Sequence, residues 1–197
     1  VMAINLRGVG ESVKTNVVLT LIELTGLLLV ILVGFWVIAG GDADFSRVVA
    51  FDTPEDKNVF LAVTTATSLA FFAMVGFEDS VNMAEECKEP RRIFPKVLLA
   101  GLCLTGLIYV LVSISAIALV PADRLSEGDT PLLQVVQAGA PGFPIGVFGV
   151  ITMFAVANSA LINMLMASRL LYGMANEGVL PRILGRVHAG RRTPWVG

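Results

Sequence analysis

Long apolar stretches alternate with short charged loops along most of the chain. The stretches cover about residues 15–39, 59–84, 96–121 and 144–170. A helix needs about 20 residues to cross the hydrocarbon core of a bilayer, which is about 30 Å thick. None of the four stretches alternates as a strand of a membrane barrel does. The pattern therefore predicts an all-α integral membrane protein with four transmembrane helices.

Basic residues are concentrated in alternate loops, and this predicts how the helices are oriented. Of the 14 Lys and Arg residues, 11 lie before the first stretch, from the end of the second to the first residue of the third, or at and beyond the end of the fourth. These are Arg7, Lys14, Lys88, Arg91, Arg92, Lys96, Arg169, Arg182, Arg186, Arg191 and Arg192. Short basic loops stay on the cytoplasmic side of a membrane. We therefore predict a multi-pass protein of the cytoplasmic membrane, with both chain ends, the loop at 85–96 and the tail at 173–197 in the cytoplasm.

Composition also indicates a membrane protein and leaves little room for enzyme chemistry. Hydrophobic residues make up 55% of the 197 residues and charged residues 15%, whereas soluble domains carry about 25% charged residues. The one histidine, His188, lies in a basic segment, so the sequence offers no buried Ser–His or Cys–His pair. Cys87 and Cys103 lack metal-ligand or disulfide spacing and are interpreted as free thiols. We expect no catalysis, metal, cofactor or nucleic-acid partner.

Two features outside the apolar stretches add to the picture. Residues 132–138 read as a short amphipathic helix, with Thr130 as its N-cap and Pro131 at its first position. The chain begins at Val1 rather than at a methionine and ends soon after a basic segment. We therefore expect the functional unit to include further helices.

Glu23 lies inside the first apolar stretch, where an ionisable side chain is costly. A charged group at that depth costs a few kcal/mol, so it is expected to face the protein interior or a water-filled cavity. Two interpretations remain open. Glu23 is a proton or cation site, or it is a structural carboxyl group that is hydrogen-bonded to a neighbouring helix.

Glu78 and Asp79 interrupt the second stretch, and two interpretations fit them as well. In a continuous helix from Phe60, Glu78 would lie about 27 Å along the axis, close to the membrane surface, as a solvated acid. Alternatively, the helix breaks near Gly76, and the exposed backbone groups line a binding cavity. Spacing alone favours the continuous helix.

Polar residues also interrupt the fourth stretch, at Asn158, Ser159 and Asn163. Ser159 and Asn163 are four residues apart and share one face of a helix. Such a stripe either holds neighbouring helices together through hydrogen bonds or lines a cavity.

Three segments carry motifs of a known family. Residues 71–78 read FFAMVGFE, residues 84–95 read AEECKEPRRIFP, and residues 168–181 read SRLLYGMANEGVLP. The first two are similar to F-x-G-F/W-E/N followed by E-E-x-x-x-P-x-R-x-x-P, and the third to S-R-x-x-Y-x-x-A-x-D/E-G-x-x-P. These patterns occur around helix six and at the end of helix eight of the amino acid–polyamine–organocation (APC) permeases, which the chain therefore resembles. Residues 5–16 are similar to that family's approach to helix five.

The resemblance implies that the four stretches are helices five to eight of a LeuT-like inverted-repeat transporter, with the second of them discontinuous near Gly76. The two half-helix ends would then hold the amino and carboxyl groups of a substrate through backbone atoms. The implied substrate-binding residues are Phe72, Val75, Gly76, Phe77 and Glu78. Phe72 matches an aromatic that closes over the substrate, while Phe77 and Glu78 match positions around its side chain.

One position departs from the family pattern. Many members carry lysine where this chain has Glu23, and that lysine can replace a coupling cation near helix eight. A carboxylate there would instead bind a cation or carry a proton. We therefore assign ion or proton coupling to Glu23, Asn158 and Ser159, with a proton or sodium as the co-ion.

The resulting prediction is a secondary active transporter that moves amino acids or related amines across the bilayer by alternating access. A membrane sensor or regulatory subunit that binds an amino acid without transporting it is the alternative. A passive channel is the third possibility, and the sequence does not identify the substrate.

Overall fold

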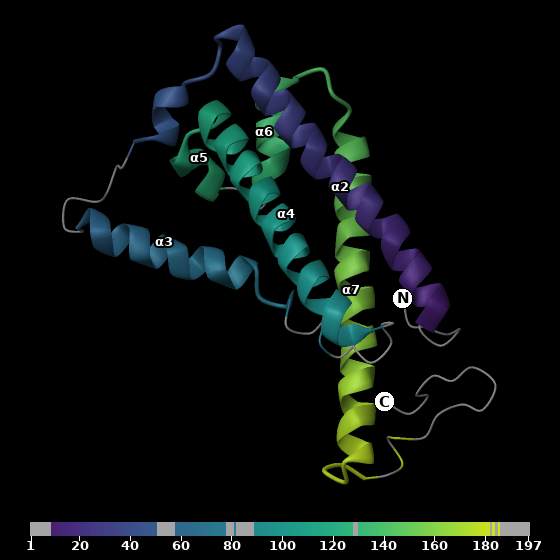
Figure 1. Ribbon diagram of the computed structural model, residues 1–197. Coiled ribbons are helices and arrows are strands. Elements are labelled where there is room, and N and C mark those ends of the chain that lie inside the picture. The colour runs from purple at the N-terminus through teal and green to yellow at the C-terminus, as the bar shows by residue number, and fades with distance from the viewer. Residues whose placement is uncertain are drawn as a thin grey trace. The chain divides into compact units, whose positions relative to one another are not determined.

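The described parts of the chain are mainly helical, as the computed structural model shows (Figure 1). The structure describes residues 9–50, 58–77, 81, 89–127, 130–181, 183 and 185. The helices within these ranges are α2 (Val9–Gly40), η1 (Phe45–Val48), α3 (Val59–Ala73), α4 (Pro90–Leu119), α5 (Ala122–Glu127), α6 (Pro131–Gly139) and α7 (Ile145–Asn176). The chain divides into two compact units, one of Val1–Leu29 with Pro144–Gly197 and one of Val30–Phe143.

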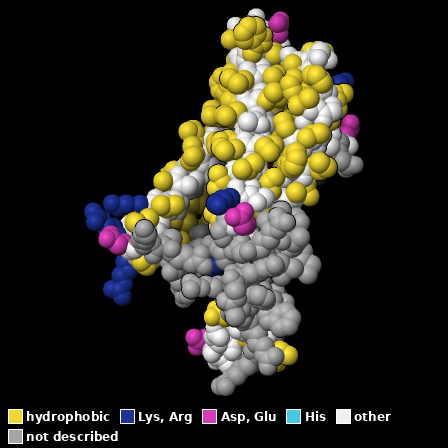
Figure 2. Space-filling model, turned by 90° about the vertical axis from the view of Figure 1, so that its right-hand side faces the viewer, with side chains coloured by type: hydrophobic (Ala, Val, Ile, Leu, Met, Phe, Trp, Pro, Cys, Tyr) yellow, Lys and Arg dark blue, Asp and Glu magenta, His cyan; other side chains and the backbone are white. Residues whose placement is uncertain are grey.

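Three helices are long and apolar enough to cross a membrane. Glu11–Gly40 and Pro90–Leu119 have 30 residues each, and Ile145–Asn176 has 32, so each is about 45 Å long. Large apolar side chains cover their outer surfaces, with Trp36 81% exposed and Leu32 68% exposed. Figure 2 shows hydrophobic side chains over most of the described helical surface that it presents. The prediction of an all-α integral membrane protein is confirmed.

The second predicted span is only partly described. Its helix, α3, has 15 residues and is therefore about 22 Å long, shorter than the hydrocarbon core. The Asn58 side chain caps its start by accepting a hydrogen bond from the backbone N–H of Phe60 (3.1 Å). Residues 78–80 and 82–84, which the prediction included in this span, lie outside the described part. The count of four spans thus stays a prediction.

In the unit of Val1–Leu29 and Pro144–Gly197, the first part of α2 packs closely against α7. A Cβ atom added at Gly26 would lie 2.7 Å from Ile151 Cγ2, so glycine permits an approach that a larger residue would prevent. Ser12 and Leu161 are almost completely buried in this unit. The close approach brings the polar side chains of α2 within reach of α7.

In the unit of Val30–Phe143, the second part of α2 packs against α4 and α6. A Cβ atom added at Gly34 would clash with the Ser115 side chain and lie 2.9 Å from Ser115 Cα. A Cβ atom at Gly139 of α6 would lie 2.8 Å from Leu119 Cδ2. Val135 of α6 is fully buried. Small residues therefore set the helix spacing in this unit too.

Short helices gather around the C-terminal end of α4 (Figure 1). Helix α6 is the predicted amphipathic helix, and Thr130 and Pro131 occupy the predicted N-cap and first-turn positions. Helices η1 and α5 were not predicted from the sequence. The backbone N–H of Asp44, just before η1, donates to the carbonyl of Ala118 (3.2 Å). Parts of the loops at 40–58 and 121–144, which the distribution of basic residues puts on the side opposite the cytoplasm, thus contact the same end of α4.

Asp44 caps η1 and gives this region a dependence on pH. The Ser46 hydroxyl and backbone N–H both donate to its carboxylate, and the Arg47 guanidinium lies 3.1 Å away. These contacts, the Ser46 hydroxyl first, lower the pKa of Asp44 below its ordinary value of 3.8. Because the pKa of Asp44 is lower in the folded than in the unfolded protein, the cap stabilises η1 fully at pH values above the unfolded-state pKa. This stabilisation is lost as the pH falls through the folded-state pKa.

We therefore expect Asp44→Ala to expose the backbone amide of Val49, which donates to Ser46 in η1, at neutral pH. The measurement is hydrogen–deuterium exchange of the full-length protein in nanodiscs, corrected for intrinsic exchange rates. The wild type should lose the same protection only below pH 4 or so. Equal protection of wild type and variant at pH 7 would contradict the assignment of Asp44 as the cap.

Candidate functional site

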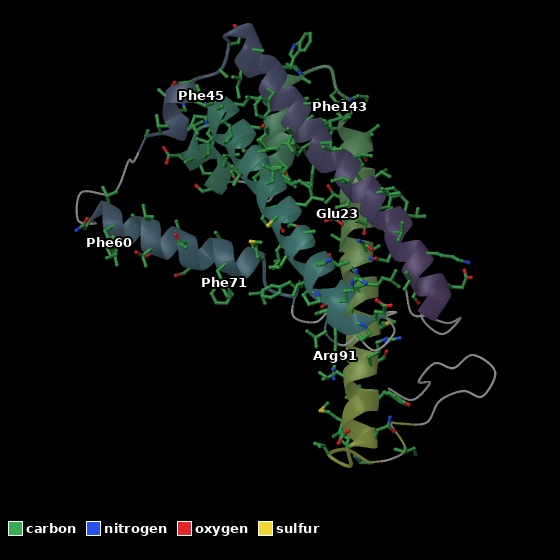
Figure 3. The ribbon with its side chains drawn as sticks, in the orientation of Figure 1. Glu23, Phe45, Phe60, Phe71, Arg91 and Phe143 are labelled. Carbon is green, nitrogen blue, oxygen red and sulfur yellow. The ribbon has the colours of Figure 1, made fainter. Side chains whose placement is uncertain are left out.

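A polar cluster joins α2 and α7 in the unit of Val1–Leu29 and Pro144–Gly197. Asn16, Thr20 and Glu23 follow one another at spacings of four and three residues, so they lie on one face of α2. Asn158 of α7 contacts all three. Its Oδ1 accepts from Asn16 Nδ2 (2.8 Å), and its Nδ2 donates to Thr20 Oγ1 (3.1 Å) and Glu23 Oε2 (3.4 Å). Figure 3 labels Glu23 on α2, beside α7.

Burial makes these hydrogen bonds important. Asn158 is 3% exposed, and Glu23 is half-buried in a helix long enough to span a membrane. A buried amide that lacks partners costs roughly 1–3 kcal/mol, and more is at stake when the partner is charged. Asn158 uses both of its N–H donors and its carbonyl oxygen, so its capacity is well satisfied. The cluster therefore holds a carboxyl group within an apolar helix pair.

The structure brings together two of the three residues assigned to coupling. Glu23 and Asn158 are in hydrogen-bond contact, whereas Ser159 is exposed. The backbone carbonyl of Ser159 accepts a hydrogen bond from Asn163 Nδ2 (2.8 Å) on the same helix. Sequence reasoning missed Asn16 and Thr20, although their spacing to Glu23 on one helix face was a usable signal.

The predicted substrate region lies in the other unit, where α3 ends. Helix α3 stops at Ala73, and the N–H groups of Met74 and Val75 bond to carbonyls three residues earlier (3.0 and 3.2 Å). Gly76 then adopts φ +115°, which L-residues with side chains rarely occupy. The helix thus ends three residues before the glycine at which the resemblance implied a break. Residues 82–84, through which the second half-helix was predicted to run, lie outside the described part.

An open, mainly apolar groove of about 390 Å³ lies between this interruption and α4. It is lined by Ala73, Met74, Val75, Phe77, Phe94, Val97, Leu98, Gly101, Leu102, Thr105 and Tyr109. The Tyr109 hydroxyl donates to the carbonyl of Ala73, the last residue of α3 (3.3 Å). A carbonyl at a helix end lacks an intrahelical partner, so this bond ties the end of α3 to α4.

The remaining predicted substrate residues lie differently. Val75 and Phe77 line the groove, while Phe72 is 71% exposed and packs edge-on against Phe71, with ring centroids 6.4 Å apart. Glu78 lies outside the described residues. Across the described ranges, no group of three or more His, Cys, Asp and Glu side chains is placed to hold a metal ion. The described residues therefore provide a polar cluster between two long apolar helices and an apolar groove at the end of α3.

These features define an α-helical membrane protein with an ionisable group between two spanning helices. The family model for amino acid permeases matches residues 1–197, and the chain belongs to that family, within the APC superfamily. It is 31% identical over 92% of its length to the chloroplastic cationic amino acid transporter 9 of Arabidopsis thaliana. It is also 24% and 28% identical to the branched-chain amino acid permease BcaP and the methylthioribose transporter of Bacillus subtilis, over 96% and 99% of its length.

The chain spans only part of these relatives. The matched regions cover 30% of the Arabidopsis transporter, 39% of BcaP and 40% of the methylthioribose transporter. The activity of the whole protein is therefore argued below as a proposal.

Proposed function

We propose that this chain is part of a secondary active transporter that moves amino acids or related amines across the cytoplasmic membrane by alternating access. Its spans would be helices five to eight of a LeuT-like inverted repeat. Membership of the amino acid permease family supports transport. The relatives are named for cationic amino acids, branched-chain amino acids and methylthioribose, and the two named for amino acids support the proposed substrate class.

The observation that carries the coupled mechanism is the hydrogen-bonded Glu23–Asn158 cluster between α2 and α7. Ionisable groups within spanning helices are costly and line ion or proton pathways as a rule. Glu23 can take up a proton from one side and release it to the other when the protein changes conformation. We therefore propose proton-coupled transport with Glu23 as carrier, with sodium coupling as the competing outcome.

The proposed substrate site is the interruption after α3. Val75 and Phe77 line the adjacent groove, and the φ of Gly76 turns the backbone out of the helix. Backbone groups freed in this way, with Phe72 and Glu78 nearby in the chain, would hold the amino and carboxyl ends of a substrate.

Counterflow in proteoliposomes tests the proposal. Proteoliposomes that contain the full-length protein are loaded with unlabelled arginine or leucine. Entry of the same amino acid in labelled form is then followed. A transporter gives a transient accumulation that saturates with substrate. A sensor binds the amino acid, seen as a thermal shift, but exchanges none, and a channel conducts without saturation. Either of these last two results would overturn the proposal.

The proposed orientation can be tested separately by cysteine labelling. Val49, after η1, is 66% exposed, and the Arg92 side chain near the start of α4 is 77% exposed. In a background with Cys87 and Cys103 replaced by serine, we expect a membrane-impermeant maleimide to label Val49→Cys in intact cells and Arg92→Cys only after permeabilisation. The basis is the 11-to-3 division of the 14 basic residues between alternate loops. The opposite labelling pattern would show that the helices are oriented the other way round in the membrane.

A further inference from the structure

The hydrogen bonds around Glu23 follow one direction. An ionised carboxylate only accepts hydrogen bonds, so the group of Asn158 that lies 3.4 Å from Glu23 Oε2 must be its NH₂. This orientation turns Oδ1 of Asn158 toward Asn16, which donates to it through Nδ2 at 2.8 Å. Asn16, Asn158 and Glu23 therefore form a chain in which each donor points toward the carboxylate.

Protonation of Glu23 leaves a carbonyl oxygen that can still accept and adds an O–H donor, and this new donor is satisfied at Asn158 by the opposite direction. Asn158 can accept from the Glu23 O–H if the carboxamide rotates by half a turn and presents Oδ1. The NH₂ of Asn158 then faces Asn16, which accepts after the same rotation. Carbonyl and NH₂ groups occupy nearly equivalent positions in a carboxamide, and the Thr20 hydroxyl serves as donor or acceptor, so the number of hydrogen bonds is kept.

We propose that Asn16 and Asn158 form a reversible amide pair that keeps Glu23 hydrogen-bonded in both its ionised and its protonated form. The inference rests on the proposed role of Glu23 as proton carrier. Asn16 is a positioning residue in this arrangement, because it acts on Glu23 through Asn158. A chain of hydrogen bonds that ends at a charge is strengthened along its length, so Asn16 favours the ionised form more than the neutral one.

The other charged side chains of the two helices lie at a distance from the cluster. On α2, Glu11 and Lys14 pair with each other (3.5 Å), and Lys14 precedes Glu23 by about 14 Å of helix. On α7, Arg169 follows Asn158 by about 16 Å of helix, and Tyr172 lies one turn farther. Asn158 is thus the amide that hydrogen-bonds the carboxyl group of Glu23, and Asn16 lies behind it.

The test compares the pH dependence of uptake in four variants of the full-length protein in proteoliposomes. These are Asn16→Leu, Asn158→Leu, the double variant, and Thr25→Val as a control. Thr25 is exposed on α2 and donates only to its own helix, at the Ile22 carbonyl. Each variant is first checked by size-exclusion chromatography, and Asn16→Ser, whose side chain is too short to reach Asn158, replaces Asn16→Leu if that protein is not recovered.

Loss of the donor to the carboxylate disfavours the ionised form, so the midpoint of the pH profile should rise by about one pH unit in Asn158→Leu. Asn16→Leu should raise it less, and the double variant should equal Asn158→Leu, because Asn16 acts through Asn158. A wild-type midpoint in Asn16→Leu, or shifts that simply add in the double variant, would overturn the inference. A wild type without pH-driven uptake would instead overturn the proposed coupling and, with it, the amide pair.

Discussion

Glu23→Gln should abolish accumulation driven by a pH gradient while leaving counterflow exchange largely intact. Glutamine has the shape of the protonated carboxyl group, and its oxygen can still accept from Asn158 Nδ2, as Glu23 Oε2 does at 3.4 Å. The binding of α2 to α7 is therefore kept, and only the exchangeable proton is removed. Exchange needs no net proton movement, whereas accumulation does.

The expected size of the effect follows from coupling arithmetic. With one proton per substrate, a gradient of one pH unit supports accumulation of about tenfold. In Glu23→Gln, the substrate concentration inside the vesicles should not exceed the concentration outside. Glu11→Gln is the matched control, because Glu11 is an exposed carboxylate on the same helix that pairs with Lys14, and it should accumulate substrate like the wild type. Accumulation by Glu23→Gln under a pH gradient alone would show that another group carries the proton, and a sodium requirement in the wild type would replace the proton with a cation.

The long helices could be predicted from the sequence because their signal is strong and local. Mainly apolar stretches of about 25 residues leave no other stable arrangement in a bilayer, where backbone groups must bond within their own segment. The start of α6 was equally predictable, since Pro131 lacks an N–H and suits a first helical turn. In both cases, neighbouring residues alone decide the structure.

The cluster around Glu23 was only half predictable. Its charge made Glu23 conspicuous, but Asn16 and Thr20 lie near the start of an apolar stretch, where polar residues are common. Only the contact with Asn158, more than 130 residues away, distinguishes them. The helix spacing at Gly34 has the same origin, because its partner Ser115 is defined by packing and not by sequence distance.

The interruption after α3 shows a third case. Spacing alone favoured a continuous helix, and the resemblance to the permeases favoured a break at Gly76. In the structure the helix ends at Ala73, before that glycine. Local propensity did not reveal the end, since a single glycine in an apolar helix costs only about 1 kcal/mol.

Gly76→Val should lower substrate affinity by roughly 10- to 100-fold. The reason is conformational, because a Cβ atom at Gly76 would meet no atom of the described residues within 4 Å. A β-branched residue at φ +115° is strained by roughly 1–3 kcal/mol, and the backbone relieves the strain by rotating. That rotation moves the peptide groups between Val75 and Phe77, which the proposed site uses to hold the substrate.

The measurement is the concentration dependence of arginine or leucine uptake by the full-length protein. Gly149→Val is the matched control, because Gly149 is an exposed glycine of α7 with open space around it and without a positive φ. Strain at Gly76 should raise the half-saturating concentration in Gly76→Val alone, while both variants insert and purify alike. Phe72→Ala, if Phe72 closes over the substrate, should also weaken uptake, whereas the exposed Leu107→Ala should not. Normal uptake by Gly76→Val would mean that the substrate binds elsewhere, because a backbone site centred on this glycine does not survive a change in its φ.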